Sequence, residues 1–141
     1  MTRYIEVEVE GVTAVARLLD DKAPGTSQRL WDALPVQLTL RHLSWAGEGA
    51  FVRIEKLQDP DFPLENRLSF YMPGTICYRP ENVEVVFCYR QCQARTLVGR
   101  NGNLYANHFA SFEEPYDKIL QIFENTHEEG AKQLTIRRRE S

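Results

Sequence analysis

The chain begins with a strict alternation of apolar and polar side chains. Between residues 3 and 10, isoleucine and valine occupy every second position, and glutamates occupy positions between them. This period of two predicts a half-buried strand with a solvated acidic face. The dipeptide Glu10-Gly11 supplies a turn, so residues 12–19 are expected to return as the partner strand.

Two other segments have the spacing of amphipathic helices. The first, residues 20–34, opens with two aspartates that complement the helix dipole and a proline that suits the first turn, and Pro35 ends it. The second follows Ser111 and Glu114, a spacing that resembles a capping box, and ends near Gly130. The expected apolar stripes are Leu30, Trp31 and Leu34 in the first helix, and Tyr116, Ile119, Leu120 and Phe123 in the second.

The rest of the pattern consists of short strands. Residues 83–89 contain the continuous apolar run Val85-Val86-Phe87, which is typical of a strand buried on both faces. Proline and aspartate dominate residues 58–67, a long loop that we expect to form a lid or rim. The other strands are expected at residues 36–45, 50–54, 69–72, 75–78, 104–111 and 133–138, with turns at 46–49, 79–82 and 99–103.

Together these elements predict a single domain over residues 1–141. About eight strands and two helices indicate a mainly β protein of the α+β class. The order of the elements favours a closed, mostly antiparallel β-barrel whose ends are covered by the two helices. A chain of this length buries enough surface to fold without disulfides.

Composition and charge restrict the function. The chain is 43% hydrophobic and 26% charged, as expected for a soluble globular protein. Its net charge of −3 argues against nucleic-acid binding, and the basic run Arg137-Arg138-Arg139 is typical of a solvated chain end. No apolar run approaches the ~20 residues that span a bilayer, so no membrane partner is expected. An odd number of cysteines without a signal peptide favours a cytoplasmic location.

Metal ligands and cofactor motifs are not indicated. The three cysteines form no CxxC pair and have no metal-ligand spacing with the histidines, so we expect no cofactor and no metal. A metal site built from His42, His108, His127 and a carboxylate is the alternative, and it requires the fold to bring distant segments together.

Candidate chemistry gathers in residues 40–52, which are expected to form two strands joined by a Gly-rich turn. His42 continues the apolar face of its strand if no bulge intervenes. A histidine acts as acid, base or hydrogen-bond donor near neutral pH, and arginine binds carboxylates with two hydrogen bonds. Alternatively, His42 is a packed structural residue and Glu48 a solvated turn carboxylate. The candidate ligand-binding residues are Arg41, His42, Trp45, Glu48, Tyr71, Tyr78, Tyr89 and Arg90, and His42 is also the candidate catalytic residue.

Several segments resemble the cyclophilin fold. They are Asp21-Lys22-Ala23-Pro24-Gly25-Thr26, Pro73-Gly74-Thr75-Ile76, Val85-Val86-Phe87-Cys88 and Asn107-His108-Phe109-Ala110-Ser111, in the order in which cyclophilins carry similar segments. The combination of Ala23-Pro24-x-Thr26, Leu34-Pro35 and His42-x-x-Trp45-x-Gly47-Glu48 is similar to an uncharacterised bacterial family of single-domain proteins with a cyclophilin-like fold. This resemblance implies a barrel and no particular reaction.

The residues of prolyl isomerases are mostly replaced. Cyclophilins carry a catalytic arginine on the strand after the first helix, where this chain has Arg41-His42, so either His42 or a shifted Arg41 takes its place. The family's Phe-Met-x-Gln-Gly-Gly segment is absent. Cys77-Tyr78-Arg79 stands where Met-Ala-Asn is expected.

We therefore favour a small-molecule binding module for a carboxylate or a cyclic amide, without prolyl isomerase chemistry. Cyclophilin-like domains also occur in bacterial enzymes that act on ureas and 5-oxoproline, which suggests these ligand classes by analogy. The alternatives are an enzyme that uses His42 as acid or base on a small amide or carboxylate, a protein that assembles with copies of itself, and a peptidyl-prolyl isomerase.

Overall fold

The computed structural model describes residues 2–44, 46–93 and 105–140. Its helices are α1 (Pro24–Ala33) and α2 (Asp117–Glu129), and one 3-10 turn, η1, spans Glu55–Leu57. The predicted turn at residues 99–103 lies outside the described residues. The strands are β1 (Tyr4–Val9), β2 (Val12–Leu18), β3 (Val36–His42), β4 (Gly47–Arg53), β5 (Arg67–Leu68), β6 (Phe70–Tyr71), β7 (Thr75–Arg79), β8 (Glu84–Gln93), β9 (Ala106–Phe112) and β10 (Lys132–Arg138).

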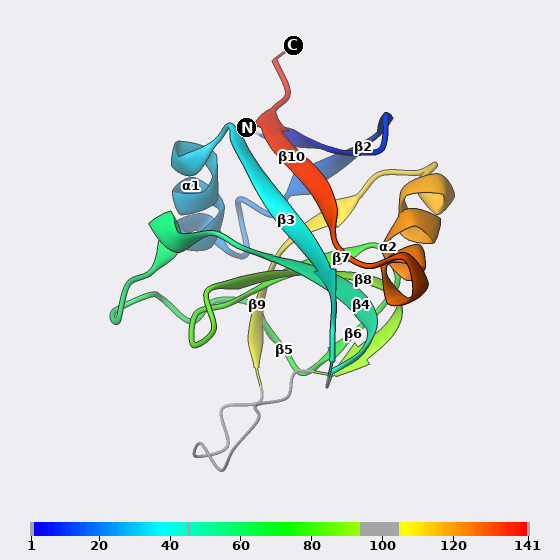
Figure 1. The fold of residues 1–141 in the computed structure, drawn as a ribbon. Coiled ribbons are helices and arrows are strands. Elements are labelled where there is room, and N and C mark those ends of the chain that lie inside the picture. Colours follow the sequence, from blue (N-terminus) through cyan, green and yellow to red (C-terminus); the bar gives the residue numbers. More distant parts are fainter. Residues whose placement is uncertain (1, 45, 94–104, 141) are drawn as a thin grey trace.

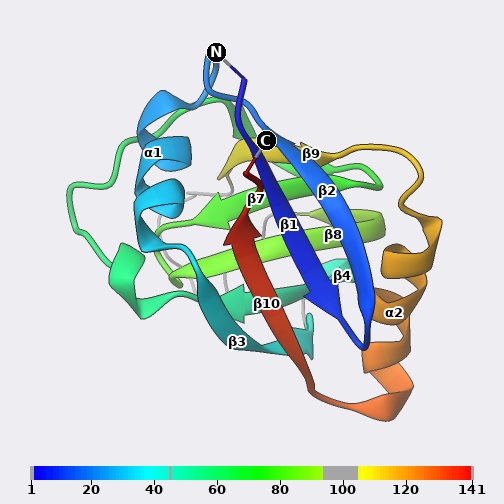
Figure 2. The same ribbon diagram turned by 90° about the horizontal axis from the view of Figure 1, so that it is seen from above.

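Eight of these strands form a closed antiparallel barrel (Figures 1 and 2). Around the barrel the order is β2-β1-β10-β3-β4-β8-β7-β9. The circle closes because β2 also pairs with β9, with Leu18 opposite Ala110. The short strands β5 and β6 lie outside the circle, on β9 and β8 respectively. The closed, mainly β barrel expected from the element order is confirmed.

The alternation of side chains determines which face of each strand is inside. In β1 and β10, Val7 lies opposite Ile136 and Val9 opposite Leu134, and all four are at most 1% exposed. The glutamates of β1 point outward, where Glu6 and Glu8 both pair with Arg137 of β10. The period of two therefore predicted both the strands and their inner faces.

Strand β8 is buried on both faces, as its continuous apolar run predicted. Val85 and Phe87 belong to the main core inside the barrel. Val86 and Cys88 belong to a second apolar cluster on the outer face, which also contains Tyr71 of β6. All three cysteines are free thiols in this cluster (Cys77, Cys88 and Cys92).

The helices cover opposite sides of the barrel (Figure 2). Helix α1 contacts β9 and η1, and α2 contacts β2, β3, β4 and β8. Helix α2 buries Ile119, Leu120 and Phe123 as predicted, whereas Tyr116 is only partly buried; the helix ends at Glu129, and Gly130 is its C-cap as expected. The predicted capping box is wrong: Ser111 lies in β9, where its hydroxyl contacts His108 Nε2 at 3.0 Å, and the N-cap residue of α2 is Tyr116. Strand pairing with β2 and β7 extends β9 past Ser111, so the helix begins later.

The N-terminus of α1 is capped by a residue from the long loop. Glu65 accepts hydrogen bonds from the main-chain N–H groups of Gly25 and Thr26, each at 2.9 Å, and from the Thr26 hydroxyl at 3.0 Å. The aspartates expected at this helix end do not lie in its first turn, and Asp20 instead pairs with Arg3. A carboxylate next to the free N–H groups satisfies them and complements the helix dipole.

Because of this cap, we expect that a substitution in the long loop destabilises α1, although the loop is far from the helix in sequence. Glu65→Ala should lower the free energy of unfolding by about 2 kcal/mol, because it leaves two main-chain donors and the buried Thr26 hydroxyl without this acceptor. Urea unfolding measures the change. Asp61→Ala, which removes an exposed carboxylate from the same loop, is the control and should change stability little. Equal losses in both variants would contradict the capping role.

Candidate functional site

The register of β3 decides the orientation of Arg41 and His42. Arg41 lies opposite Phe51 of β4, and His42 lies opposite Ala50, which is fully buried inside the barrel. Hence His42 continues the inner face of Leu40, and Arg41 points to the outer face. At this end of the strand the inner face meets α2, so that the ring of His42 lies 4.8 Å from the ring of His127.

Four of the predicted site residues line one cavity between the barrel and α2. We call it the His42 cavity, and its volume is about 520 Å³. Strands β3, β4 and β8 supply the predicted residues His42, Glu48, Tyr89 and Arg90. Gly47 of β4 also lines the cavity, next to Glu48, and the polar face of α2 forms the other side. Lining residues from the helix are Gln121, Glu124, Asn125, His127 and Glu128.

Both ring nitrogens of His42 are hydrogen-bonded. Nδ1 lies 2.7 Å from the main-chain oxygen of Leu43, which can only accept, so Nδ1 carries a proton. Nε2 lies 2.8 Å from the hydroxyl of Tyr89, which donates to it when the ring is neutral. Burial, followed by the nearby Glu124 carboxylate, raises the pKa of Tyr89, so the phenol keeps its proton at neutral pH.

Arg90 is held between two carboxylates. Its Nε lies 2.6 Å from Glu48, and its terminal nitrogens lie 3.2 and 2.8 Å from the two oxygens of Glu124. These hydrogen bonds, those of Glu124 first, raise the pKa of Arg90. The pairing joins β4, β8 and α2 at the rim of the cavity. It also leaves this arginine with little capacity to bind a further anion.

Two glycines place Glu48 at this rim. Gly47 has φ +107°, a conformation that other residues rarely adopt, and a Cβ there would lie 2.8 Å from the main-chain oxygen of Gln91. Gly49 packs directly against the side chains of Cys92 and Leu43. The close approach of β4 and β8 around a register shift between Gly47 and Gly49 therefore requires glycine at both positions.

The predicted Gly-rich turn is wrong in its position. Residues 46–49 were expected to form the turn, but β4 begins at Gly47, so most of this segment is already paired with β8. Trp45 lies outside the described residues.

The other predicted site residues lie elsewhere. Tyr71 is buried in the outer apolar cluster, where burial raises its pKa. Tyr78 is buried in the main core, donates a hydrogen bond to the main-chain oxygen of Leu57 at 3.2 Å, and has a pKa raised to about 12 by burial. Arg41 lines a different cleft on the outer face.

The contribution of α2 was not predicted. Gln121, Glu124, Asn125 and Glu128 have the i, i+3, i+4, i+7 spacing of one helix face, and that signal is present in the sequence. Gln121 Nε2 donates to Asn125 Oδ1 at 3.0 Å. No other hydrogen bond among the described residues engages Gln121 Oε1 or Asn125 Nδ2, so the pair offers an acceptor and a donor to the cavity.

The described residues contain neither a cluster suited to a metal ion nor a helix suited to a bilayer. Within residues 2–44, 46–93 and 105–140, no group of three or more histidine, cysteine, aspartate or glutamate side chains is arranged to hold a metal ion. Neither described helix has the length and apolar character needed to cross a bilayer.

Solved structures with the same architecture have very different sequences. The hypothetical protein AF2241 from Archaeoglobus fulgidus, known from its solution structure, is similar with a TM-score of 0.66 and 13% identity, covering 97% of this chain and 95% of that one. McbB, in a complex with tryptophan, is similar with a TM-score of 0.75 and 16% identity over 97% of this chain. The match spans only 45% of the McbB chain. At these identities, the similarities show the fold alone.

Sequence comparison identifies a family without an assigned activity. No curated protein matches the chain. Residues 5–137, nearly the whole barrel, match DUF3830, which is described as a protein family of unknown function. The chain therefore belongs to the DUF3830 family.

Proposed function

We propose that this protein binds a small polar molecule in the His42 cavity, and that it does so as a bacterial, cytoplasmic protein with a cyclophilin-like barrel. The observation that supports this most directly is the convergence of His42, Tyr89, Glu48 and Arg90 on one cavity with the polar face of α2. A volume of about 520 Å³ suits a small ligand.

Of the two expected ligand classes, the charges favour the cyclic amide. Three carboxylates line the cavity, those of Glu48, Glu124 and Glu128, against the single guanidinium of Arg90. That guanidinium is already bound by Glu48 and Glu124. A carboxylate ligand would meet net negative charge and would have to displace a carboxylate of the protein, whereas a neutral ligand would not.

A cyclic amide also matches the free hydrogen-bonding groups. In a lactam or cyclic urea the N–H and C=O groups are held on the same edge of the ring. Gln121 Oε1 can accept from the ligand N–H, and Asn125 Nδ2 can donate to its C=O. On the opposite wall, the hydrogen bond from the Tyr89 hydroxyl to Nε2 of His42 orients the Tyr89 ring, which is tilted by 55° to the His42 ring.

The binding proposal can be tested with four small molecules. Pyrrolidone and hydantoin carry the cyclic amide, N-methylpyrrolidone lacks the N–H, and pyroglutamate adds a carboxylate to the same ring. Pyrrolidone and hydantoin should raise the thermal unfolding temperature, since a ligand at a hundred times its Kd adds about 2.7 kcal/mol of stability. The other two should have a smaller effect.

Matched helix variants locate the binding. Gln121→Ala should weaken pyrrolidone binding about tenfold, which corresponds to loss of one well-placed hydrogen bond. Gln28→Ala is the control, because Gln28 forms an i, i+4 hydrogen bond with Asp32 on α1, away from the cavity. Stabilisation by none of the amides, or stronger binding of pyroglutamate than of pyrrolidone, would contradict the proposal.

The hydrogen bond between Tyr89 and His42 favours one second function, a small amide-hydrolysing enzyme in which His42 acts as acid or base. Under this alternative, His42→Ala would abolish ring opening of the lactam while leaving its binding intact. A variant that loses only stability assigns His42 a structural role. A self-assembling protein and a prolyl isomerase remain the other expectations, which sedimentation and a peptide isomerisation assay test.

A further inference from the structure

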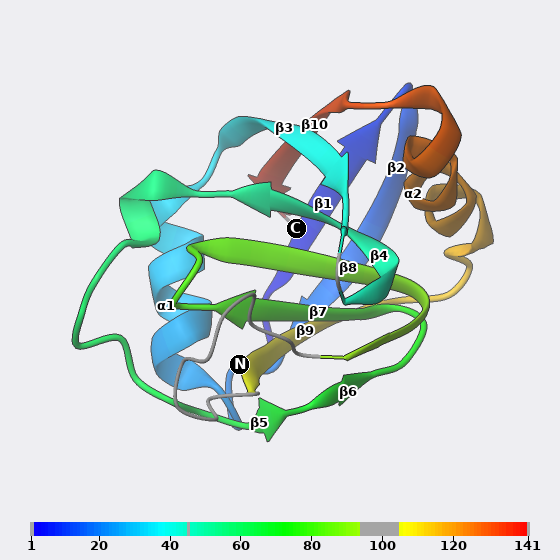
Figure 3. The same cartoon turned by 60° about the horizontal axis from the view of Figure 1, so that its bottom comes forward.

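The pairing of β3 with β4 stops after two residues on each strand. Arg41 pairs with Phe51 and His42 with Ala50, and the Leu43 N–H donates to the main-chain oxygen of Gly49. Continuing the ladder would join Thr39 to Arg53, but these residues are not paired with each other. Instead β3 follows β10, and the chain after β4 bends into η1. Figure 3 shows the two strands close together at one end and apart at the other.

Where β3 and β4 separate, main-chain N–H and C=O groups of the two strands face one another without forming hydrogen bonds between the strands. In an antiparallel pair, every second residue directs both its N–H and its C=O to the neighbouring strand. The bond between Leu43 and Gly49 fixes this alternation on β3, and the bond from the Ile54 N–H to the Val83 oxygen fixes it on β4. Thr39 and Arg53 therefore direct their main-chain groups toward each other across the opening.

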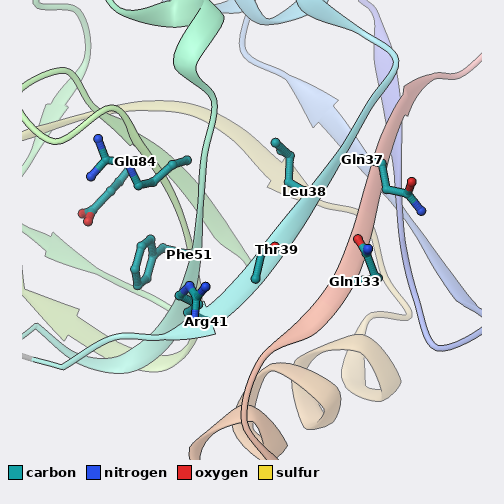
Figure 4. A pocket seen from close by; sticks show the side chains of 8 residues that line it. Gln37, Leu38, Thr39, Arg41, Phe51, Glu84 and Gln133 are labelled. Atoms are coloured by element: carbon teal, nitrogen blue, oxygen red, sulfur yellow. The ribbon is translucent and has the colours of Figure 1, made fainter.

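A cleft occupies this opening on the outer face of the barrel. Its volume is about 520 Å³ (Figure 4). Arg41 and Phe51 lie together where the strands meet, and Thr39 follows along β3. Leu38, which packs against the main core, also lines the cleft, so the opening reaches the edge of the barrel interior.

The charge of the cleft is opposite to that of the His42 cavity. It is lined by two arginines, Arg41 and Arg53, and by one carboxylate, that of Glu84. Glu84 also lies 3.9 Å from Arg79, whose side chain is almost entirely buried. Arg53 approaches Glu55 at 3.5 Å, with both side chains more than half exposed. Among the described residues, Arg41 has no ion pair and no side-chain hydrogen bond, although it lies beside the half-buried ring of Phe51.

We propose that the cleft between β3 and β4 binds a small carboxylate with an apolar body. The guanidinium of Arg41 binds the carboxylate, the main-chain N–H groups of Thr39 and Arg53 are available as further donors, and Phe51 and Leu38 contact the apolar part. This site is separate from the His42 cavity, and it takes the ligand class that the acidic rim of that cavity disfavours. The proposal does not depend on amide binding by α2.

Benzoate is a suitable probe, with benzamide as its uncharged counterpart. Titration of each compound into the isotopically labelled protein should shift the backbone amide signals of Thr39, Arg41 and Arg53 with benzoate and much less with benzamide. Arg41→Gln should weaken benzoate binding about tenfold, because a charge-assisted pair of hydrogen bonds is lost. Glu84→Gln should strengthen it, because the one carboxylate in the cleft becomes neutral.

Two further variants keep the test specific. Arg17→Gln removes an exposed arginine from the outer face of β2, where it approaches Glu113 at 3.8 Å, and should leave benzoate binding unchanged. Gln121→Ala, which alters the His42 cavity, should also leave it unchanged. Benzoate that binds Arg41→Gln as tightly as the unaltered protein would overturn the proposal. Failure of benzoate to shift the signals of Thr39, Arg41 and Arg53 at millimolar concentration would do so as well.

Discussion

Phe123→Ala is expected to lower the free energy of unfolding by about 4 kcal/mol, the typical cost of removing a fully buried phenylalanine ring. Phe123 is completely buried on the inner face of α2. Its ring stacks on Phe87 of β8 at a centroid distance of 5.0 Å and lies 6.0 Å from Phe112 of β9. The ring thus joins the helix to the barrel interior, and chemical denaturation followed by circular dichroism measures the loss.

The same variant should weaken ligand binding in the His42 cavity. The helix supplies half of that cavity, so looser packing of α2 displaces Gln121 and Asn125 together. Lys118→Ala is the stability control, since Lys118 is exposed on the same helix. If Phe123→Ala lowers the free energy of unfolding by less than about 1 kcal/mol, the contacts of Phe123 with Phe87 and Phe112 do not hold α2 in place.

Gly49→Ala should lower the free energy of unfolding by about 3 kcal/mol, the upper range for forcing extra volume into a packed interior. A Cβ at this position would lie 2.6 Å from Cys92 Sγ, 2.9 Å from Leu43 Cδ1 and 2.9 Å from the main-chain oxygen of Phe87. The last contact is with backbone, which cannot rotate away. Strands β4 and β8 would have to separate, and Glu48 would lose its position next to Arg90.

Gly11→Ala separates this steric effect from the general cost of replacing glycine. Gly11 has φ +79° in the turn between β1 and β2, but a Cβ there would meet nothing within 4 Å. Its substitution should cost only the backbone strain, about 1 kcal/mol. The comparison is made by urea unfolding of both variants. If Gly49→Ala is no more harmful than Gly11→Ala, the two strands are not held together as closely as the structure indicates.

Much of the barrel was predictable because its strands carry a strong local signal. The alternation in β1 and the apolar stripe of α2 each depend only on neighbours in the sequence, and the structure has both as expected. The inner orientation of His42 also followed from simple alternation without a bulge. When a strand or helix buries one face along its whole length, the spacing of its apolar residues is enough to predict that face.

Features that depend on distant contacts were not predictable in the same way. The carboxylate that caps α1 comes from Glu65, about forty positions beyond the residues it contacts, and local patterns pointed to Asp20 and Asp21 instead. The polar face of α2 was visible, but nothing local indicates that it faces His42. Tyr71 and Tyr78 look like suitable pocket residues in sequence, and the barrel buries both in apolar clusters.

The position of β10 in the barrel has a consequence for how the protein is made. This strand is the last one in the described sequence, yet it lies between β1 and β3 and pairs with both of them. The free edge of β1 is therefore covered only by a strand that follows both helices and all the other strands in sequence. Contacts of such large sequence separation form slowly, because a long loop must close first. On the ribosome, the barrel cannot close until residues 132–138 have left the exit tunnel, after β1, β2 and β3 have already emerged.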